Sequence, residues 1–417
     1  MTVMTFDAVA EARPGPRWQA RWHRSWPAYE AWFIARGGEA GPDRVACRAA
    51  LGRHMPELLP TYDRLLALAG GGDRAARFLS TWCPPAYLGG CSLAARAAGG
   101  EVRLVRNYDL SPDLNEGFLL RSEWTGRAVM GMVEFLWGLS DGINDAGLSV
   151  ALAYGGSSRA AEGFGITTIL RYLLETCTTV EGALAVLARV PSHMAYNLVL
   201  ADRHGQTASV ELSPGGGVRR MAQPIATNHQ RDAKQSAATA FTRTYQRHAH
   251  LQRLPAAPAE LHRHFLEEPL HQDRFAAGFG TLFTAEYDPV RRSMRLLWPG
   301  AEWRQSLDDF TEGQRLITLT TPAPEHVLAP ARVPARRAPA TRPVVAYPTP
   351  LPRRAPQPVY RPVCEPAGLD WALAARIDWQ AVGRDYAAGR GRPIPAYLAE
   401  IAAAFHVRED GTGASGV

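Results

Sequence analysis

Residues 90–110 read GCSLAARAAGGEVRLVRNYDL, in which two short runs with apolar residues flank the pair Gly99-Gly100. A Gly-Gly pair between two such runs favours a two-residue β-hairpin, because glycine adopts the positive φ angles of the tight turn without steric cost. The second strand would then return alongside the first. Arg106 and Asp109 would lie on the partner strand, roughly opposite Cys91.

The rest of the chain alternates between helical and strand patterns. Short strand patterns at 147–154, 196–212 and 292–298 surround a helical stripe of Ile, Leu and Val that begins at residue 166, and residues 1 to about 88 look helical. Helices that alternate with antiparallel hairpins predict a layered α+β fold.

The chain divides into four regions that differ in residue composition and in hydrophobic pattern. We expect a helical N-terminal segment (1–90), a core (91–321), a linker rich in proline and arginine (322–366) and a short helical tail (367–417). The linker composition does not support a buried core and favours an extended chain. The apolar face of the tail would fold back on the core or dock another protein.

Composition narrows the classes of function. Of the 417 residues, 46% are hydrophobic and 21% charged, as in globular proteins with a sizeable core. The net charge is +6, but the basic residues are almost all arginines spread along the chain, so we expect no nucleic-acid partner. No apolar stretch follows a basic N-terminus and none is long enough to span a membrane, which favours the cytoplasm and no membrane association. The five cysteines form no C-x-x-C pair, so we expect no disulfide framework, no metal and no cofactor.

Cys91 is the candidate nucleophile. A free thiol is mostly protonated at neutral pH and needs a nearby base. If the Gly90–Cys91 peptide bond broke, the new α-amine of Cys91 would lie within reach of its own sulfur and would accept the thiol proton. Glycine at position 90 leaves the carbonyl carbon open to attack and allows strain without a Cβ clash. An ordinary turn before a buried cysteine is the simpler interpretation of these residues alone.

Residues that follow Cys91 in the sequence supply further candidate catalytic groups. Arg106 and Asp109 would hold the α-amine and favour the thiolate, or would form an exposed ion pair of little consequence. Asn144, in DGINDAGL, is either a turn residue or a donor to a developing oxyanion, and Asn228 with His229, in IATNHQ, follows a strand. Two asparagines in separate strand–loop units fit an oxyanion hole.

The ordered set GCS, RNYD, GINDAGL and TNH resembles the acyl-coenzyme A:6-aminopenicillanic acid acyl-transferase family of N-terminal-nucleophile enzymes, over about residues 58–300. The resemblance implies a four-layer αββα sandwich and a precursor that cleaves itself between Gly90 and Cys91. It implies that Cys91 is the nucleophile, that Arg106 and Asp109 orient its amine and thiol, and that Asn144 and Asn228 stabilise the oxyanion. An arginine expected after the TNH motif matches Arg247, with Arg243 as a rival.

The expected activity is therefore cleavage or formation of amide bonds through a thioester on Cys91. Substrates would be small acyl amides or acyl thioesters, with acyl-coenzyme A as a possible substrate rather than a cofactor. The two self-cleavage fragments would stay associated. Two alternatives remain at this point: an unprocessed hydrolase that pairs Cys91 with His229 or His193, and a non-enzymatic scaffold that recruits a partner through its tail.

Overall fold

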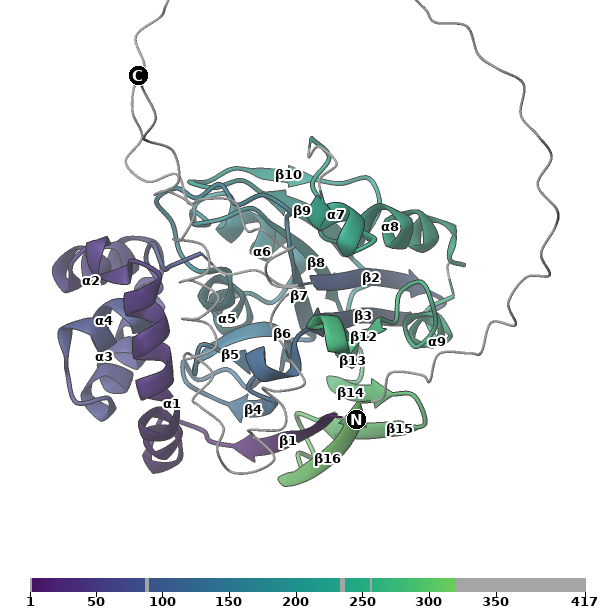
Figure 1. Cartoon of the computed structure of the whole chain (residues 1–417). Helices are drawn as coiled ribbons and strands as arrows, with labels where there is room; N and C mark the ends of the chain where they lie inside the picture. Colours follow the sequence, from purple (N-terminus) through teal and green to yellow (C-terminus); the bar gives the residue numbers. More distant parts are fainter. Residues whose placement is uncertain (1, 87–89, 233–236, 256, 320–417) are drawn as a thin grey trace, which may run out of the picture. The chain divides into compact units, whose positions relative to one another are not determined.

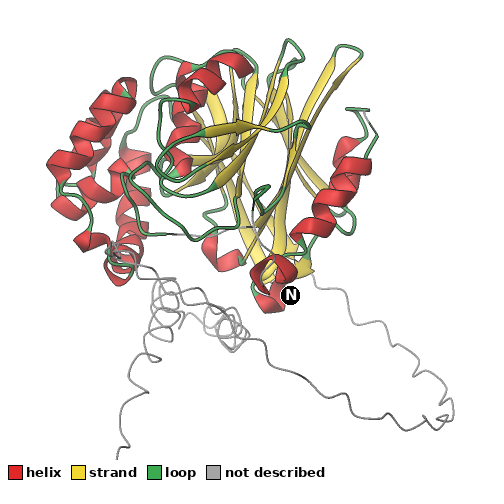
Figure 2. Ribbon diagram, turned by 90° about the horizontal axis from the view of Figure 1, so that it is seen from above, coloured by secondary structure: helices red, strands yellow, loops and turns green. Residues whose placement is uncertain are grey.

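In the computed structural model, which describes residues 2–86, 90–232, 237–255 and 257–319, two β-sheets stack between layers of helices (Figures 1 and 2). The first sheet has nine strands, in the order β10-β9-β8-β7-β6-β5-β4-β1-β16. Its strands are β1 (Thr2–Ala10), β4 (Phe118–Ser122), β5 (Val129–Glu134), β6 (Gly138–Asn144), β7 (Leu148–Tyr154), β8 (Tyr196–Asp202), β9 (Thr207–Leu212), β10 (Val218–Arg220) and β16 (Gly313–Leu319).

The second sheet has seven strands, with β11-β2-β3-β13-β14-β15 in order and β12 paired to β13. Its strands are β2 (Gly90–Ala98), β3 (Glu101–Leu110), β11 (Ile225–Ala226), β12 (Asp273–Arg274), β13 (Phe279–Asp288), β14 (Ser293–Trp298) and β15 (Ala301–Ser306). The hairpin predicted at Gly99-Gly100 is confirmed: β2 pairs antiparallel with β3, Cys91 opposite Tyr108, and both glycines have positive φ, 60° and 80°.

Helices cover the outer face of each sheet. The nine-stranded sheet shares one apolar core with α1 (Pro16–Ala35), α2 (Arg44–His54), α3 (Leu59–Leu68), α4 (Asp73–Ser80), α5 (Ile166–Thr176) and α6 (Val180–Leu187). The seven-stranded sheet is covered by α7 (Ala237–Phe241), α8 (Thr244–Arg253) and α9 (Leu261–Phe265), and a small core joins it to α8 and α9. Single turns of 3₁₀ helix occur at Gly38–Ala40, Pro56–Leu58, Pro112–Leu114 and Phe275–Ala277.

A third apolar core lies between the two sheets and includes Cys91, Leu93 and Phe283. Three cores between four layers form an αββα sandwich, so the predicted fold class is confirmed. Strands buried on both faces explain why β5, β6, β8 and β13 are buried along their whole length.

One expectation about the N-terminal segment is wrong. Residues 1–90 are not entirely helical, because Thr2–Ala10 forms strand β1. This strand pairs antiparallel with β16 and parallel with β4, so it lies inside the nine-stranded sheet. The segment before Cys91 is therefore built into the core as well as covering it.

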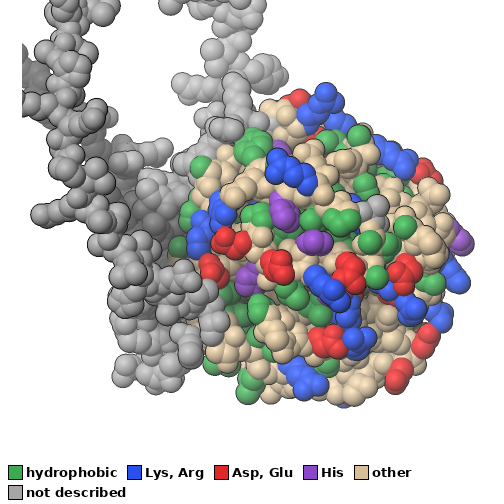
Figure 3. Space-filling model, turned by 90° about the vertical axis from the view of Figure 1, so that its right-hand side faces the viewer, with side chains coloured by type: hydrophobic (Ala, Val, Ile, Leu, Met, Phe, Trp, Pro, Cys, Tyr) green, Lys and Arg blue, Asp and Glu red, His purple; other side chains and the backbone are tan. Residues whose placement is uncertain are grey.

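The expected linker (322–366) and tail (367–417) lie outside the described ranges. Within those ranges no helix is long and apolar enough to cross a membrane. On the face of the core shown in Figure 3, arginines, carboxylates and histidines are interspersed.

Candidate active site

Cys91 is the second residue of β2, and its side chain is only 1% exposed. Its peptide N–H donates to Asn228 Oδ1 at 2.9 Å, and its carbonyl oxygen accepts from Arg247 Nη1. Arg106 Nη2 lies 3.3 Å from Cys91 Sγ. The nitrogen, the carbonyl oxygen and the sulfur of Cys91 each contact a different side chain. All three of these side chains are among the candidate site residues in the sequence analysis.

Because the hairpin is pleated, the side chains around Cys91 lie on opposite faces of the sheet. Cys91 and its cross-strand partner Tyr108 face the core between the sheets, as does Arg106, which reaches across to the nine-stranded sheet. Asp109 faces the other way, toward Arg247 of α8. Side chains alternate along a strand, so residues 106 and 108 share one face and residue 109 takes the other.

Arg106 is fixed on the sulfur's face by a buried ion pair. Its Nη1 donates to Ser140 Oγ at 2.9 Å and to the carboxylate of Asp141, and neither side chain of the ion pair is exposed. Its guanidinium also lies 4.2 Å from the centre of the Tyr108 ring. Asp141 in turn accepts from the hydroxyl of Tyr287. The positive charge beside Sγ is therefore compensated and rigidly placed.

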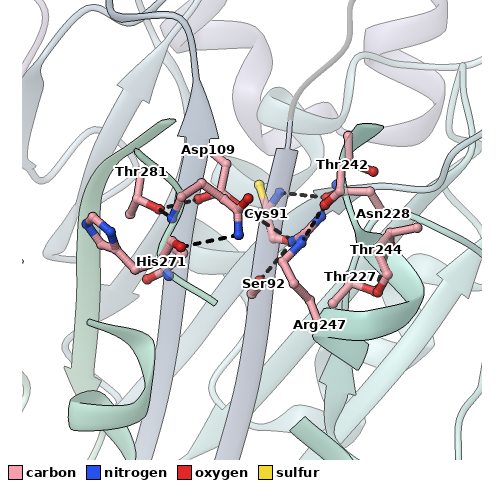
Figure 4. Close-up of polar contacts among 12 residues, drawn as sticks. Cys91, Ser92, Asp109, Thr227, Asn228, Thr242, Thr244, Arg247, His271 and Thr281 are labelled. Atoms are coloured by element: carbon pink, nitrogen blue, oxygen red, sulfur yellow. Dashed lines mark hydrogen bonds and ion pairs between the residues drawn. The ribbon is translucent and has the colours of Figure 1, made fainter. Parts of the chain in front are cut away.

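Arg247 organises the opposite face. It donates to Ser92 Oγ at 2.8 Å and to Asn228 Oδ1 at 2.7 Å, and it forms an ion pair with Asp109 at 3.5 Å (Figure 4). Of the two arginines expected after the TNH motif, Arg247 is the one that contacts Cys91 and Asn228. Arg243 lies at the surface, where it contacts Gln246 and Glu268.

Asp109 is fully buried beside Gly90, its cross-strand partner. The hydroxyl of Thr281 donates to its Oδ1 at 2.7 Å. Burial raises the pKa of Asp109, while Arg247 and the Thr281 hydrogen bond act in the opposite direction. The Asp109 carboxylate is thus held between Thr281 and Arg247.

The thiol of Cys91 is not activated in this structure. Burial raises its pKa to about 11, although the Arg106 guanidinium acts to lower it. A thiol with this pKa is almost entirely protonated at neutral pH, and a thiolate is the form that attacks carbonyl carbons. Catalysis by Cys91 therefore requires a group that takes its proton.

Gly90 has a steric reason to be glycine. A Cβ atom at this position would lie 2.4 Å from the Phe279 ring and 2.7 Å from the carbonyl oxygen of Asp109. The strand starts so close to its neighbours that only a residue without a side chain fits. Because the second of these contacts is with backbone, a rotamer change would not relieve it.

Asn228 and Asn144 differ in what their side chains do. Asn228 binds the N–H of Cys91 through Oδ1, and its Nδ2 donates to the carbonyl oxygen of Tyr154 at 3.3 Å. The assignment of Asn144 to an oxyanion-stabilising pair is corrected. Its Nδ2 donates to the carbonyl oxygens of Leu174 and Cys177, and its Oδ1 accepts from the N–H of Leu148, so it ties β6 to the end of α5 and closes a turn.

The two histidines of the Cys–His alternative also have other partners. The Nδ1 of His229 lies 3.2 Å from Thr227 Oγ1 and 2.9 Å from Thr244 Oγ1, and burial lowers the pKa of the ring to about 4. The His193 ring bonds to the carbonyl oxygen of Ala161. No hydrogen bond between either ring and Cys91 occurs among the described residues, so the geometry does not form a Cys–His pair.

Comparison with known proteins gives the family. Residues 96–303 match the family described as acyl-coenzyme A:6-aminopenicillanic acid acyl-transferase. The chain belongs to this family. The match begins just after Cys91 and ends close to the upper limit of the resemblance expected from the motifs. The four-layer αββα fold is of the N-terminal-nucleophile hydrolase type, as the resemblance implied.

Several solved structures are similar to this chain, whereas a search among curated proteins found no significant match. Penicillin V acylase from Agrobacterium tumefaciens is 17% identical, with 54% of this chain and 90% of that chain covered and a TM-score of 0.38. A variant of conjugated bile acid hydrolase from Clostridium perfringens is 14% identical, with 57% and 100% covered and a TM-score of 0.39. The N-acylethanolamine-hydrolyzing acid amidase orthologue from Caenorhabditis elegans is 15% identical, with 55% and 100% covered and a TM-score of 0.35.

Sequence reasoning missed the polar groups that hold Arg106 and Asp109 in place. Asp141 and Ser140, which hold Arg106, lie in GLSDGIN, a strand buried at every position. An ionisable residue in such an apolar strand is a usable signal, since a buried charge requires a partner. Thr281, which binds Asp109, carries no comparable signal in the sequence.

Proposed function

We propose that the chain is a self-processing N-terminal-cysteine enzyme that cleaves or forms amide bonds through a thioester on Cys91. The observation that carries this proposal is the arrangement around Cys91. At the start of a buried strand, its N–H donates to Asn228, its carbonyl oxygen accepts from Arg247 and its sulfur lies beside Arg106. Any buried residue needs partners for its N–H and carbonyl oxygen, but a cysteine that only fills a core needs no guanidinium beside its sulfur.

In the first stage the chain cuts itself. Cys91 Sγ attacks the carbonyl carbon of Gly90, the C–N bond breaks, and the thiol proton ends on the nitrogen of Cys91. Water then hydrolyses the thioester, which gives a carboxylate on Gly90 and a free thiol with a free α-amine on Cys91. Asn228 Oδ1, which accepts from the peptide N–H, is placed to accept from that amine. Asp109, next to Gly90 in register, would supply its counter-charge.

In the second stage the α-amine is the base. An α-amine titrates near pH 8, so at neutral pH part of the population is free to take the thiol proton. The thiolate, beside Arg106, attacks the substrate carbonyl and expels an amine or a thiol. Asn228 Nδ2, which now donates to the carbonyl oxygen of Tyr154, would donate to the oxyanion instead. Water or an amine then resolves the thioester, giving hydrolysis or acyl transfer.

The N-terminal fragment would stay bound after the cut. Strand β1 is hydrogen-bonded on both sides, to β4 and to β16. Trp18, Trp22 and Leu65, which precede the cut, are buried in the same apolar core as the nine-stranded sheet. Loss of the fragment would expose this core to water, which opposes dissociation.

The substrate class follows from the chemistry: a small acyl amide or acyl thioester, acyl-coenzyme A included. We expect incubation with a panel of both kinds to add an acyl group to Cys91, detected by intact mass and located by peptide mass. The matched control is Cys91→Ser, which keeps the strand geometry but makes a more stable ester. Absence of an adduct on Cys91 with any acyl donor would refute the proposed catalytic role.

A further inference from the structure

The inference concerns Glu134, a buried carboxylate at the end of β5 that no step of the proposed mechanism uses. The side chain is only 9% exposed. Its Oε1 is fully buried and has no hydrogen-bond partner among the described residues. A buried carboxylate oxygen without a partner is costly, and such an atom in a native fold requires an explanation.

Glu134 lies on the sulfur's face of the site. It interacts with the hydroxyl of Tyr108, the residue that pairs directly with Cys91 across the hairpin. It also interacts electrostatically with Arg106 and with Cys91 itself. Glu134 therefore approaches the thiol from the nine-stranded sheet, whereas Asp109 and Arg247 approach residue 91 from the opposite face.

Two other carboxylates lie near Glu134. Asp141 is bound by Arg106 and by Tyr287. Glu116, in the loop before β4, accepts through Oε1 from the Tyr29 hydroxyl at 2.6 Å and from the N–H of Leu136 at 2.9 Å, and its Oε2 is unpaired among the described residues. The carboxylates that act on the Cys91 thiol are Asp109 and Glu134. Asp109 is paired through both oxygens, with Thr281 and with Arg247, whereas Glu134 Oε1 has no partner among the described residues.

The backbone around Glu134 is held in an uncommon conformation. The two residues that follow it, Phe135 and Leu136, have positive φ angles of 55° and 70° although neither is glycine. Trp18 Nε1 of α1 donates to the carbonyl oxygen of Leu136 at 3.0 Å and helps to hold this turn. Such conformations cost free energy and cluster at functional sites. The N-terminal segment thus positions the turn that carries Glu134.

Burial raises the pKa of Glu134 to about 7, with Glu116 and Asp141 acting in the same direction and Arg106 and Tyr108 opposing them. A base is most effective when its pKa lies near the working pH. At neutral pH Glu134 is divided between its two forms, so it would both take and return a proton.

We propose that Glu134 accepts the proton of the Cys91 thiol when the intact chain cleaves itself. This rests on the proposed self-processing, in which no α-amine exists before the cut. The Sγ–H bond breaks and the proton passes to Glu134 Oε1. Sγ bonds to the carbonyl carbon of Gly90, the C–N bond to Cys91 breaks, and the leaving nitrogen takes the proton back from Glu134. No external oxidant, reductant or cofactor is needed.

The test follows the rate of self-cleavage from pH 5.5 to 8.5. The full chain is purified in denaturant, refolded by dilution, and sampled for intact mass, with Cys91→Ala as the blank. We expect the wild-type rate to rise with pH with a midpoint near 7, the pKa of Glu134. Glu134→Gln should cleave at least about tenfold more slowly at pH 8 and lose this rise, in line with the usual contribution of a general base. Glu116→Gln, the matched control, should keep the rise.

Two further variants separate a chemical role from a structural one. Glu134→Asp retains an ionisable group and should recover part of the rate together with the pH dependence. Tyr108→Phe removes a contact that favours the charged carboxylate, so the midpoint should move to higher pH. Glu134→Gln that cleaves at the wild-type rate with an unchanged pH profile would overturn the role of Glu134 alone. A folded wild-type chain that never cleaves would overturn both this role and self-processing.

Discussion

The buried Glu134 should make the stability of the uncut chain depend on pH in a way that a single substitution removes. Its pKa is raised from 4.5 to about 7 in the folded chain. The folded state therefore binds the proton more tightly than the unfolded state does. The resulting free-energy penalty is absent well below pH 4.5, grows between pH 4.5 and 7, and is complete above pH 7.

The magnitude follows from the shift. A difference of about 2.5 pKa units corresponds to about 3 kcal/mol at 1.36 kcal/mol per unit. Glu134→Gln has no such titration. The difference in unfolding free energy between Glu134→Gln and its parent should thus rise by about 3 kcal/mol in favour of the glutamine variant from pH 4.5 to pH 8. Any constant cost of the amide cancels in this comparison.

The assay is urea unfolding of both proteins at each pH, in a Cys91→Ala background that keeps the chain uncut. Glu101→Gln, at the turn end of the β2–β3 hairpin, is the matched control for the exchange of a glutamate for a glutamine. A difference between Glu134→Gln and its parent that stays constant from pH 4.5 to 8 would refute the reasoning, because it would mean that the carboxylate is ionised in the fold as easily as in water.

Three further substitutions test the supporting contacts. Arg247→Met should lower the unfolding free energy by about 3 kcal/mol or more, because it leaves the buried Asp109 without its cation. Arg243→Met, at the surface, should lower it by less than about 1 kcal/mol. Equal losses for the two variants in chemical denaturation would contradict the different roles given to these arginines. Gly90→Ala should destabilise the uncut chain by about 1–3 kcal/mol, since the new methyl group meets the Asp109 carbonyl, and an unchanged melting temperature would rule this clash out. Asn144→Ala should cost about 2 kcal/mol or more through its lost hydrogen bonds; a variant of wild-type stability with abolished acyl transfer would instead restore Asn144 to the oxyanion hole.

The hairpin and the position of the nucleophile could be predicted from the sequence because they depend on local features. A Gly-Gly turn fixes the register of the two strands that it joins, so Arg106 and Asp109 had to return near Cys91. To predict which face of the sheet each side chain points to, the alternation of side chains along the strand must also be considered. This alternation places Arg106 and Asp109 on opposite faces of the sheet.

The remaining contacts depend on long-range packing that leaves little local trace. Strand β1 pairs with β16, about three hundred residues away in the chain, and nothing in the sequence of Thr2–Ala10 indicates this partner. Asn144 lies in a sequence typical of a turn, and the turn is what it serves. Arg243 and Arg247 are one helical turn apart, and the first turn of α8 decides which one is buried.

The central claim is that Gly90–Cys91 is cut by the chain itself, and intact mass measured on the purified protein tests it most directly. Cleavage after residue 90 of 417 should give two co-purifying fragments of about 10 and 35 kDa from the 45.5 kDa chain, the larger beginning with Cys91. Cys91→Ala should remain a single chain. A folded wild-type protein that stays at full length, or a Cys91→Ala variant that is cut at the same bond, would contradict the account.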